Sequence, residues 1–344
     1  MADDCPLFSI IITTYFAENT IRKCMDSVLA QTETSYEIIV VDDASQDGTV
    51  AILHEYAARC DKIRLILHPE NKGKSVGLNE GVRAAVGQYI SIIDCDDWVS
   101  EDCYEKRKAS LLAVPGADVL IAGYRVNYIE PQGENKGQYR KRIPPFPINQ
   151  PLTFRDMVAS VEEVHTKNLF AFSVRMLFRR EFLLRENIFN REDMVVGEDA
   201  DFNLRALNRA KTIVACDEVG YLYDIRNQGS VMRQPYKKSY ENDMQLLYET
   251  RAAMCMDIES YRQDLIEYYV RVLTFLVIRN QTKSPEGLTP AALRRILNRP
   301  CFRETWKATG LKLYHKGFPD LILRLLIKFR LVHLYCLLVR RSQK

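Results

Sequence analysis

Short apolar runs alternate with helical patterns through the first third of the chain. Four of these runs are predicted strands, at residues 8–13, 37–41, 63–67 and 89–93. Between them, apolar residues recur at helical spacing over residues 21–29, 49–60 and 74–86. A strand, helix, strand order that repeats in this way predicts an α/β fold, in which a mainly parallel central sheet is flanked by helices.

Acidic residues follow two of the predicted strands directly. Asp42 and Asp43 end the second strand, and Asp94, Asp96 and Asp97 end the fourth. Ligands of parallel sheets bind in the crevice outside the carboxyl ends of the strands, so we expect both clusters to face that crevice. Closely spaced carboxylates suit Mg²⁺ or Mn²⁺, which proteins hold together with substrate phosphates. The alternative is that these acids are solvated turn or helix-capping residues.

Two residues near this edge have side chains that suit a nucleotide. Asp43 can accept hydrogen bonds from a nucleobase or ribose, or it can form an Asx turn before the next helix. Lys74 follows Gly73 at the start of a predicted helix, where it can meet a phosphate together with helix N-terminal amides, or be a surface lysine only. The sequence contains neither the GxGxxG fingerprint nor a P-loop.

A second acidic segment lies far from the first along the chain. Glu198 and Asp199 precede apolar residues at helical spacing. They are either functional acids or acids that favour a helix N-terminus. Residues 131–151, rich in Pro, Gly, Gln and Lys, are typical of a long surface loop. From residue 239 onward the pattern is helical throughout.

Five segments in this order resemble family 2 glycosyltransferases. Four match their donor-binding half, namely FSIIITTY at 8–15, EIIVVDDASQDGT at 37–49, NKGKSVGLNEG at 71–81 and YISIIDCDDW at 89–98. Gly197-Glu198-Asp199 resembles the acceptor-side ED motif of the family. The resemblance covers residues 7–230, and five motifs in the right order are far more specific than any one of them.

The resemblance implies a GT-A fold with a Rossmann-like nucleotide-binding half, and an inverting transfer from a nucleoside-diphosphate sugar. The expected donor is a UDP-hexose or UDP-N-acetylhexosamine, and the expected cofactor is Mn²⁺ or Mg²⁺. The expected acceptor is a hydroxyl of a glycan or lipid-linked molecule in cell-surface polysaccharide biosynthesis. The chain then divides into a catalytic domain, residues 1–238, with a donor half to residue 124 and an acceptor half from 125, and a C-terminal helical region, residues 239–344.

Carried over by position, the resemblance also implies roles for named residues. Asp199 is the general base, which takes the proton from the acceptor hydroxyl as that oxygen attacks the anomeric carbon opposite the leaving diphosphate. Asp96 holds the metal ion that bridges the phosphates. The residues expected around the donor nucleotide are Thr13, Tyr15, Glu18, Asp43, Lys74 and Asp94. Contacts to the diphosphate or the acceptor are expected from Asp97, Glu198 and Arg226.

Several positions depart from the family's common pattern. Phe16 stands where many members have Asn, Ala44 where Gly is usual, and Leu78 where Arg is frequent. Many members also carry a metal-binding or diphosphate-binding His in the segment that matches 221–230. Arg226 lies in that segment here, and it is either a diphosphate contact or a structural arginine.

Positive charge is concentrated at the C-terminal end. Lys312 to Lys344 contains eight basic residues and one acidic residue, a net charge of +7, so the rest of the chain carries −4. The overall charge of +3 gives no electrostatic case for nucleic-acid binding. The apolar segment 321–339 contains Arg324, Lys328 and Arg330, each costing about 2.5 to 3.5 kcal/mol near the centre of a span, so it is not expected to cross a membrane. It is expected either to pack on the catalytic domain or a second subunit, or to lie on an anionic membrane surface.

The cellular location is predicted from the cysteines and the N-terminus. The nine cysteines form no CxxC pair, and no basic region precedes the first apolar run. Reduced thiols and the lack of a signal sequence favour a cytoplasmic protein, with the tail as a candidate peripheral contact on the inner face of the plasma membrane.

The sequence disfavours two other functions. A sugar nucleotidyltransferase would share the fold, but its Gly-rich, Arg-containing loop is missing after the first strand, where Thr13-Thr14-Tyr15 stands. A non-catalytic protein that binds nucleotide sugars or glycans is disfavoured by the joint presence of Asp43, Asp94, Asp96 and Asp199.

Overall fold

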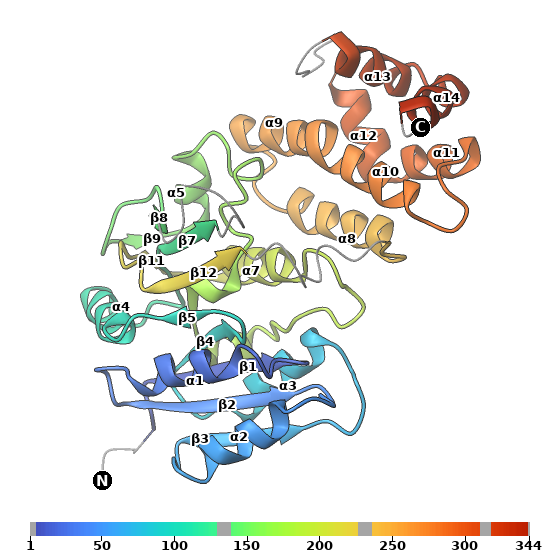
Figure 1. The fold of residues 1–344 in the computed structure, drawn as a ribbon. Helices are drawn as coiled ribbons and strands as arrows, with labels where there is room; N and C mark the ends of the chain where they lie inside the picture. Colours follow the sequence, from blue (N-terminus) through green and yellow to red (C-terminus); the bar gives the residue numbers. More distant parts are fainter. Residues whose placement is uncertain (1–4, 129–138, 226–235, 310–317, 343–344) are drawn as a thin grey trace. The chain divides into compact units, whose positions relative to one another are not determined.

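The computed structural model describes residues 5–128, 139–225, 236–309 and 318–342. The chain forms two compact units, whose elements Figure 1 labels. The first unit is assembled from residues 1–160, 171–193 and 198–229, and the second from residues 161–170, 194–197 and 230–344.

An eight-stranded sheet, in the order β3-β2-β1-β4-β10-β6-β11-β9, is the centre of the first unit. Its first four strands are parallel neighbours, namely β1 (Phe8–Thr14), β2 (Tyr36–Asp42), β3 (Ile63–Leu67) and β4 (Tyr89–Asp94). Thr13 lies opposite both Val41 and Asp94, so β1, β2 and β4 end at the same level. The mainly parallel α/β sheet predicted from the sequence is therefore confirmed, and the carboxyl ends of three strands form one edge.

The other half of this sheet is mixed. It consists of β6 (Val119–Ile121), β9 (Pro151–Leu152), β10 (Met176–Arg179) and β11 (Ile213–Ala215). β10 runs antiparallel to both β4 and β6, β11 is parallel to β6, and β9 is antiparallel to β11. A strand from far along the chain therefore lies beside β4.

The inner strands of this sheet are apolar on both faces, so both faces are covered. Ile10, Ile11 and Ile12 are consecutive in β1 and all are fully buried, as expected of a parallel strand with helices on both sides. Gly81 allows one helix to approach closely, since a Cβ there would lie 2.6 Å from Cγ2 of Ile11. The helices of this unit are α1 (Ile21–Leu29), α2 (Thr49–Ala57), α3 (Lys74–Ala84), α4 (Cys103–Ala113), α5 (Phe154–Ala159), α6 (Arg180–Arg185) and α7 (Glu198–Arg209), with a 3₁₀ turn η1 (Ser173–Arg175).

A second sheet of four short strands, in the order β5-β12-β7-β8, completes the first unit. Its strands are β5 (Trp98–Val99), β7 (Tyr124–Tyr128), β8 (Tyr139–Arg142) and β12 (Tyr221–Ile225). Leu222 of β12 pairs with Trp98, which places β12 beside the turn that follows β4. Residues 139–142 of the expected surface loop are thus a strand, whereas 131–138 lie outside the described residues.

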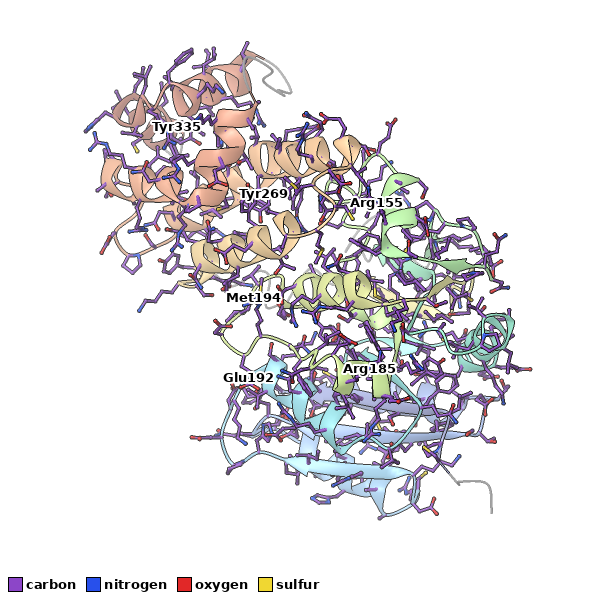
Figure 2. The ribbon with its side chains drawn as sticks, turned by 180° about the vertical axis from the view of Figure 1, so that it is seen from behind. Arg155, Arg185, Glu192, Met194, Tyr269 and Tyr335 are labelled. Carbon is purple, nitrogen blue, oxygen red and sulfur yellow. The ribbon has the colours of Figure 1, made fainter. Side chains whose placement is uncertain are left out.

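The described elements of the second unit are helical, coloured orange to red in Figure 1. They are α8 (Tyr240–Ala252), α9 (Glu259–Tyr268), α10 (Thr274–Thr282), α11 (Pro290–Asn298), α12 (Pro300–Ala308), α13 (Phe318–Lys328) and α14 (Val332–Ser342), with a π-helical turn η3 (Tyr269–Leu273) between α9 and α10. Tyr269, labelled in Figure 2, is fully buried in this unit and its hydroxyl donates to the Met244 carbonyl at 2.8 Å.

The apolar C-terminal segment forms two helices. α13 ends at Lys328, Arg330 has a left-handed backbone with φ of 58°, and α14 begins at Val332. Two of its cations bind the unit itself, since Arg324 Nη1 donates to the Val270 carbonyl at 3.2 Å and Lys328 Nζ donates to the Trp306 carbonyl at 2.6 Å. Within the described ranges, the helices are all too short or too polar to cross a membrane.

Candidate active site

Tyr221 holds the acidic turn that follows β4 through two hydrogen bonds. Tyr221 is fully buried on β12, and its hydroxyl donates to Asp97 Oδ2 at 2.5 Å and accepts from the Asp94 N–H at 3.4 Å. Burial, reinforced by the charges of Asp97 and Asp94, raises the pKa of Tyr221 well above its usual value, so the phenol stays protonated. Asp97 is buried, whereas the Asp96 carboxylate is at the surface.

Lys74 brings both acidic segments together. It begins α3, and its Nζ lies 2.8 Å from Asp94 Oδ1. Burial lowers the pKa of Lys74, but attraction to Asp199, Asp94 and Glu198 outweighs burial and raises it well above the usual value. The end of β4 and the start of α7 therefore supply carboxylates around one ammonium group.

Glu198 and Asp199, the predicted acceptor-side acids, lie at the start of α7. Oδ1 of Asp199 is buried without a hydrogen-bond partner among the described residues, and the Ser173 side chain bonds to the same carboxyl group. Burial raises the pKa of Asp199 despite the opposing charge of Lys74. Burial and the charge of Asp199 raise the pKa of Glu198 to about 7. These carboxylates are therefore stronger bases than exposed ones.

Asp43 lies almost fully buried after β2 and is held by three donors. Its Oδ1 accepts from the Lys72 N–H at 2.7 Å and lies 2.9 Å from Nδ1 of His68, while its Oδ2 accepts from the Gly73 N–H at 2.8 Å. Burial raises the pKa of Asp43, but the hydrogen bonds from His68, Lys72 and Gly73 outweigh it and lower the pKa. A carboxylate has about four acceptor positions, so Oδ2 can accept one further hydrogen bond.

The other predicted donor residues lie around the start of the chain. Thr13 is opposite Asp94 at the end of β1, and the Tyr15 ring is exposed and in edge contact with Phe16, with ring centroids 4.6 Å apart. Glu18 Oε2 accepts from the Gly48 N–H at 3.1 Å, which ties it to the start of α2. Arg226 lies outside the described residues.

The carboxylates suit a hard divalent cation. Within the described part of the chain, no group of three or more His, Cys, Asp or Glu side chains is arranged to hold a metal ion. Asp96, exposed beside Asp94, offers the one or two carboxylates that Mg²⁺ or Mn²⁺ uses when substrate phosphates and water complete its shell. These carboxylates therefore fit a divalent cation whose coordination shell is completed by phosphate oxygens and water.

Some residues that support the candidate site could not be predicted from the sequence. Tyr221 and Ser173 come from distant segments, and nothing in their local sequence marks them. His68 is part of no predicted site, yet it contacts Asp43. Asn79 lies within a quoted motif, and its amide donates to the Asn190 carbonyl at 3.0 Å, in the loop that carries Glu192 (Figure 2) toward α7.

Comparisons with known proteins identify the family of the chain. The family model "Glycosyl transferase family 2" matches residues 9–183. The uncharacterized glycosyltransferase EpsJ of Bacillus subtilis is 31% identical over 291 residues, which cover 82% of this chain and 80% of EpsJ.

Two solved structures share the fold. Staphylococcus aureus TarS 1–349 in complex with UDP-GlcNAc has a TM-score of 0.61 at 17% identity, covering 90% of this chain and 93% of that one. The mannosyltransferase PcManGT from Pyrobaculum calidifontis, in complex with GDP-Man and Mn²⁺, has a TM-score of 0.52 at 17% identity, covering 95% and 86%. With the family model matching half of its length and EpsJ aligned over most of it, the chain belongs to glycosyl transferase family 2 and has the GT-A fold.

Proposed function

We propose that this chain transfers a hexose or N-acetylhexosamine from a UDP-sugar, with inversion, to a hydroxyl of a glycan or lipid-linked acceptor in bacterial surface polysaccharide biosynthesis. The observation that carries the proposal is the contact of Lys74 with Asp94 at the carboxyl end of β4, together with the electrostatic attraction between Lys74 and Asp199. The UDP-GlcNAc held by the similarly folded TarS supports the choice of donor.

On the acceptor side, Asp199 takes the proton of the attacking hydroxyl. Its raised pKa, caused by burial, makes the carboxylate a better base than an exposed aspartate. The acceptor oxygen forms its bond to the anomeric carbon as the bond to the diphosphate breaks on the opposite face, which inverts the configuration.

On the donor side, the chain offers groups for each part of the nucleotide. The free acceptor position on Asp43 Oδ2 suits an imide N–H of uracil, with Thr13, Tyr15 and Glu18 nearby. Lys74 exchanges Asp94 for the diphosphate when the donor binds, which frees Asp94 for the ribose or sugar. Asp96 would hold Mn²⁺ or Mg²⁺, which supplies charge neutralisation to the diphosphate when bound. Asp97, fixed by Tyr221, keeps the turn that carries Asp96 in place.

Replacing the proposed base separates chemistry from binding. Asp199→Asn should lower UDP release from UDP-sugars about 10²-fold to 10⁴-fold, with the membrane fraction of the host as acceptor source. The same variant should still bind UDP with Mn²⁺, because Asp199 does not contact the nucleotide. Asp193→Asn, an exposed aspartate that precedes α7, is the matched control and should keep both properties.

The outcomes discriminate between the parts of the proposal. Full transfer by Asp199→Asn would remove that residue from the role of base. If the wild-type protein binds GDP or dTDP but not UDP, with the melting temperature as readout, the donor is wrong. If it binds no nucleotide at all, the proposed function fails.

We also propose that the C-terminal helices touch an anionic membrane surface. The specific observation is a run of exposed large apolar side chains at the α13–α14 turn and along α14, namely Phe329, Leu331, Leu334 and Leu337. Arg330 is exposed beside them. Because Arg324 and Lys328 bind carbonyls within the second unit, the contact is assigned to α14 and its preceding turn.

A further inference from the structure

A buried histidine, His68, lies between the carboxylates of Asp43 and Glu80, and Asp43 is a proposed nucleotide ligand. His68 follows β3, and its side chain is 2% exposed. Nδ1 lies 2.9 Å from Asp43 Oδ1, and Nε2 lies 2.9 Å from Glu80 Oε2 on α3. The His68 backbone is fixed as well, because its N–H donates to the Asp42 carbonyl at 2.9 Å. The imidazole therefore forms a rigid bridge from α3 to Asp43.

The geometry requires a proton on each ring nitrogen. A neutral imidazole has one N–H and one lone pair, so it can donate to only one of the two carboxylates and would direct its lone pair at the other. Burial lowers the pKa of His68, but the hydrogen bonds to Asp43 and Glu80 outweigh burial and raise it. Lys72, whose Nζ lies 3.4 Å from Glu80, opposes this rise.

The groups that face His68 come from three segments. Asp43 comes from the end of β2, Glu80 from α3, and Lys72 from the turn between β3 and α3. The pKa of Glu80 is lowered, chiefly by its hydrogen bond to His68, and the pKa of Asp43 is lowered too. Both carboxylates are therefore charged while the imidazolium persists.

We propose that His68, charged and braced by Glu80, is a positioning residue that orients the Asp43 carboxylate for the donor's nucleobase. By bonding Oδ1, His68 leaves Oδ2 as the oxygen that accepts from the base. Loss of the Nδ1 proton would direct a lone pair at Oδ1, so the ring would repel the carboxylate and leave it held by the Lys72 and Gly73 N–H groups alone. The inference rests on the proposed function, because it needs Asp43 to bind the donor nucleotide.

Three variants test this role. His68→Gln should weaken UDP affinity and raise the KM for the UDP-sugar about tenfold, while kcat changes little, because the affected bond lies at the base and not at the reacting carbon. Glu80→Gln keeps the histidine but removes one of the two charges that raise its pKa. His54→Gln, an exposed histidine on α2, is the matched control and should leave both constants unchanged.

The pH dependence distinguishes positioning from general loss of structure. Wild-type affinity for UDP should be highest while His68 is charged, below the usual imidazole pKa of about 6.5, and fall as pH rises through the raised pKa of His68. The fall should be absent from His68→Gln and should begin at lower pH in Glu80→Gln. Isothermal calorimetry with UDP and Mn²⁺ measures each curve.

Each outcome decides something definite. If the wild type binds UDP and His68→Gln binds it equally well with the same pH profile, this inference is wrong and the proposed function stands. If the wild type binds no nucleotide, the proposed function fails and the inference with it. Should His68→Gln not fold, the curve for Glu80→Gln decides alone, since Glu80 is partly exposed and its replacement leaves the core intact.

Discussion

At the scale of single residues, two departures from the family's pattern coincide with unusual backbone angles. Phe16 and Ala44 both have left-handed conformations, with φ of 52° and 64°. Many family members have Asn and Gly at these positions, and Asn and Gly tolerate this conformation best. The departures therefore concern backbone strain, and they do not by themselves remove a phosphate contact.

Ala44→Gly should stabilise the protein. A left-handed alanine costs about 1–2 kcal/mol, whereas glycine loses about 0.5–1 kcal/mol more chain entropy on folding than alanine does, so the net gain lies between about 0 and 1.5 kcal/mol. Urea denaturation measures the free energy of unfolding. Ala51→Gly, at an exposed position within α2, should have the opposite sign and cost about 1 kcal/mol. Destabilisation by Ala44→Gly would contradict the assignment of strain.

At the scale of elements, the sequence predicted the first four strands to within a residue or so at each end. The predicted run 8–13 is β1 at Phe8–Thr14, and the run 63–67 is β3 itself. β1, β2 and β4 are buried on both faces, so they are nearly continuous apolar runs that can be identified without knowing their partners. β3 lies at the edge of the sheet and contains the exposed Arg64, but its other four residues are apolar. The antiparallel placement of β10 beside β4 depends on pairing across most of the chain, which no local pattern encodes.

For the candidate site too, the sequence predicts the residues that stand in local motifs but not the contacts between distant segments. Asp43, Asp94 and Asp199 stand in motifs, so the sequence alone identifies them as candidates. Their supporting contacts, such as Tyr221 on Asp97, join segments more than a hundred residues apart and become visible only in the folded chain. The sequence also could not predict the break at Arg330, which divides the apolar C-terminal segment into two helices.

Asn79 connects α3 to the segment that leads into α7, and its replacement should affect both stability and transfer. The side chain is buried, accepts from the Asn190 N–H at 2.8 Å, and donates to the Asn190 carbonyl and to Glu192 Oε1, both at 3.0 Å. Asn79→Ala leaves buried groups unpaired, so the free energy of unfolding should fall by about 1–3 kcal/mol. UDP release should fall too, because Asp199 follows this segment.

Denaturation and UDP release should be measured on the same preparations. Asn19→Ala, at an exposed position, is the matched control and should change the free energy of unfolding by less than about 0.5 kcal/mol. Unchanged stability of Asn79→Ala would show that the segment before α7 is held by other contacts.

At the scale of the whole molecule, charge and apolar surface gather at the same end of the chain. The body carries −4 and the C-terminal 33 residues carry +7, from Lys312 to Lys344. An anionic surface would therefore attract this end and repel the body. Exposed Leu331, Leu334 and Leu337 supply the apolar contact that electrostatic attraction alone lacks.

Replacing Leu331, Leu334 and Leu337 together by Ser should release the protein from anionic phospholipid vesicles. Each leucine loses part of the about 1.5–3 kcal/mol that full burial provides, so the partition coefficient should fall at least about tenfold in a sedimentation assay. UDP binding should not change, because the nucleotide residues belong to the first unit. Added salt should weaken wild-type binding, because it screens the basic end.

The matched control replaces three exposed apolar residues of the first unit by Ser, namely Val86, Leu112 and Leu184, and should sediment as the wild type does. If the two triple variants sediment equally, α14 is not the membrane contact. Its exposed apolar side chains would then be assigned to a contact with protein.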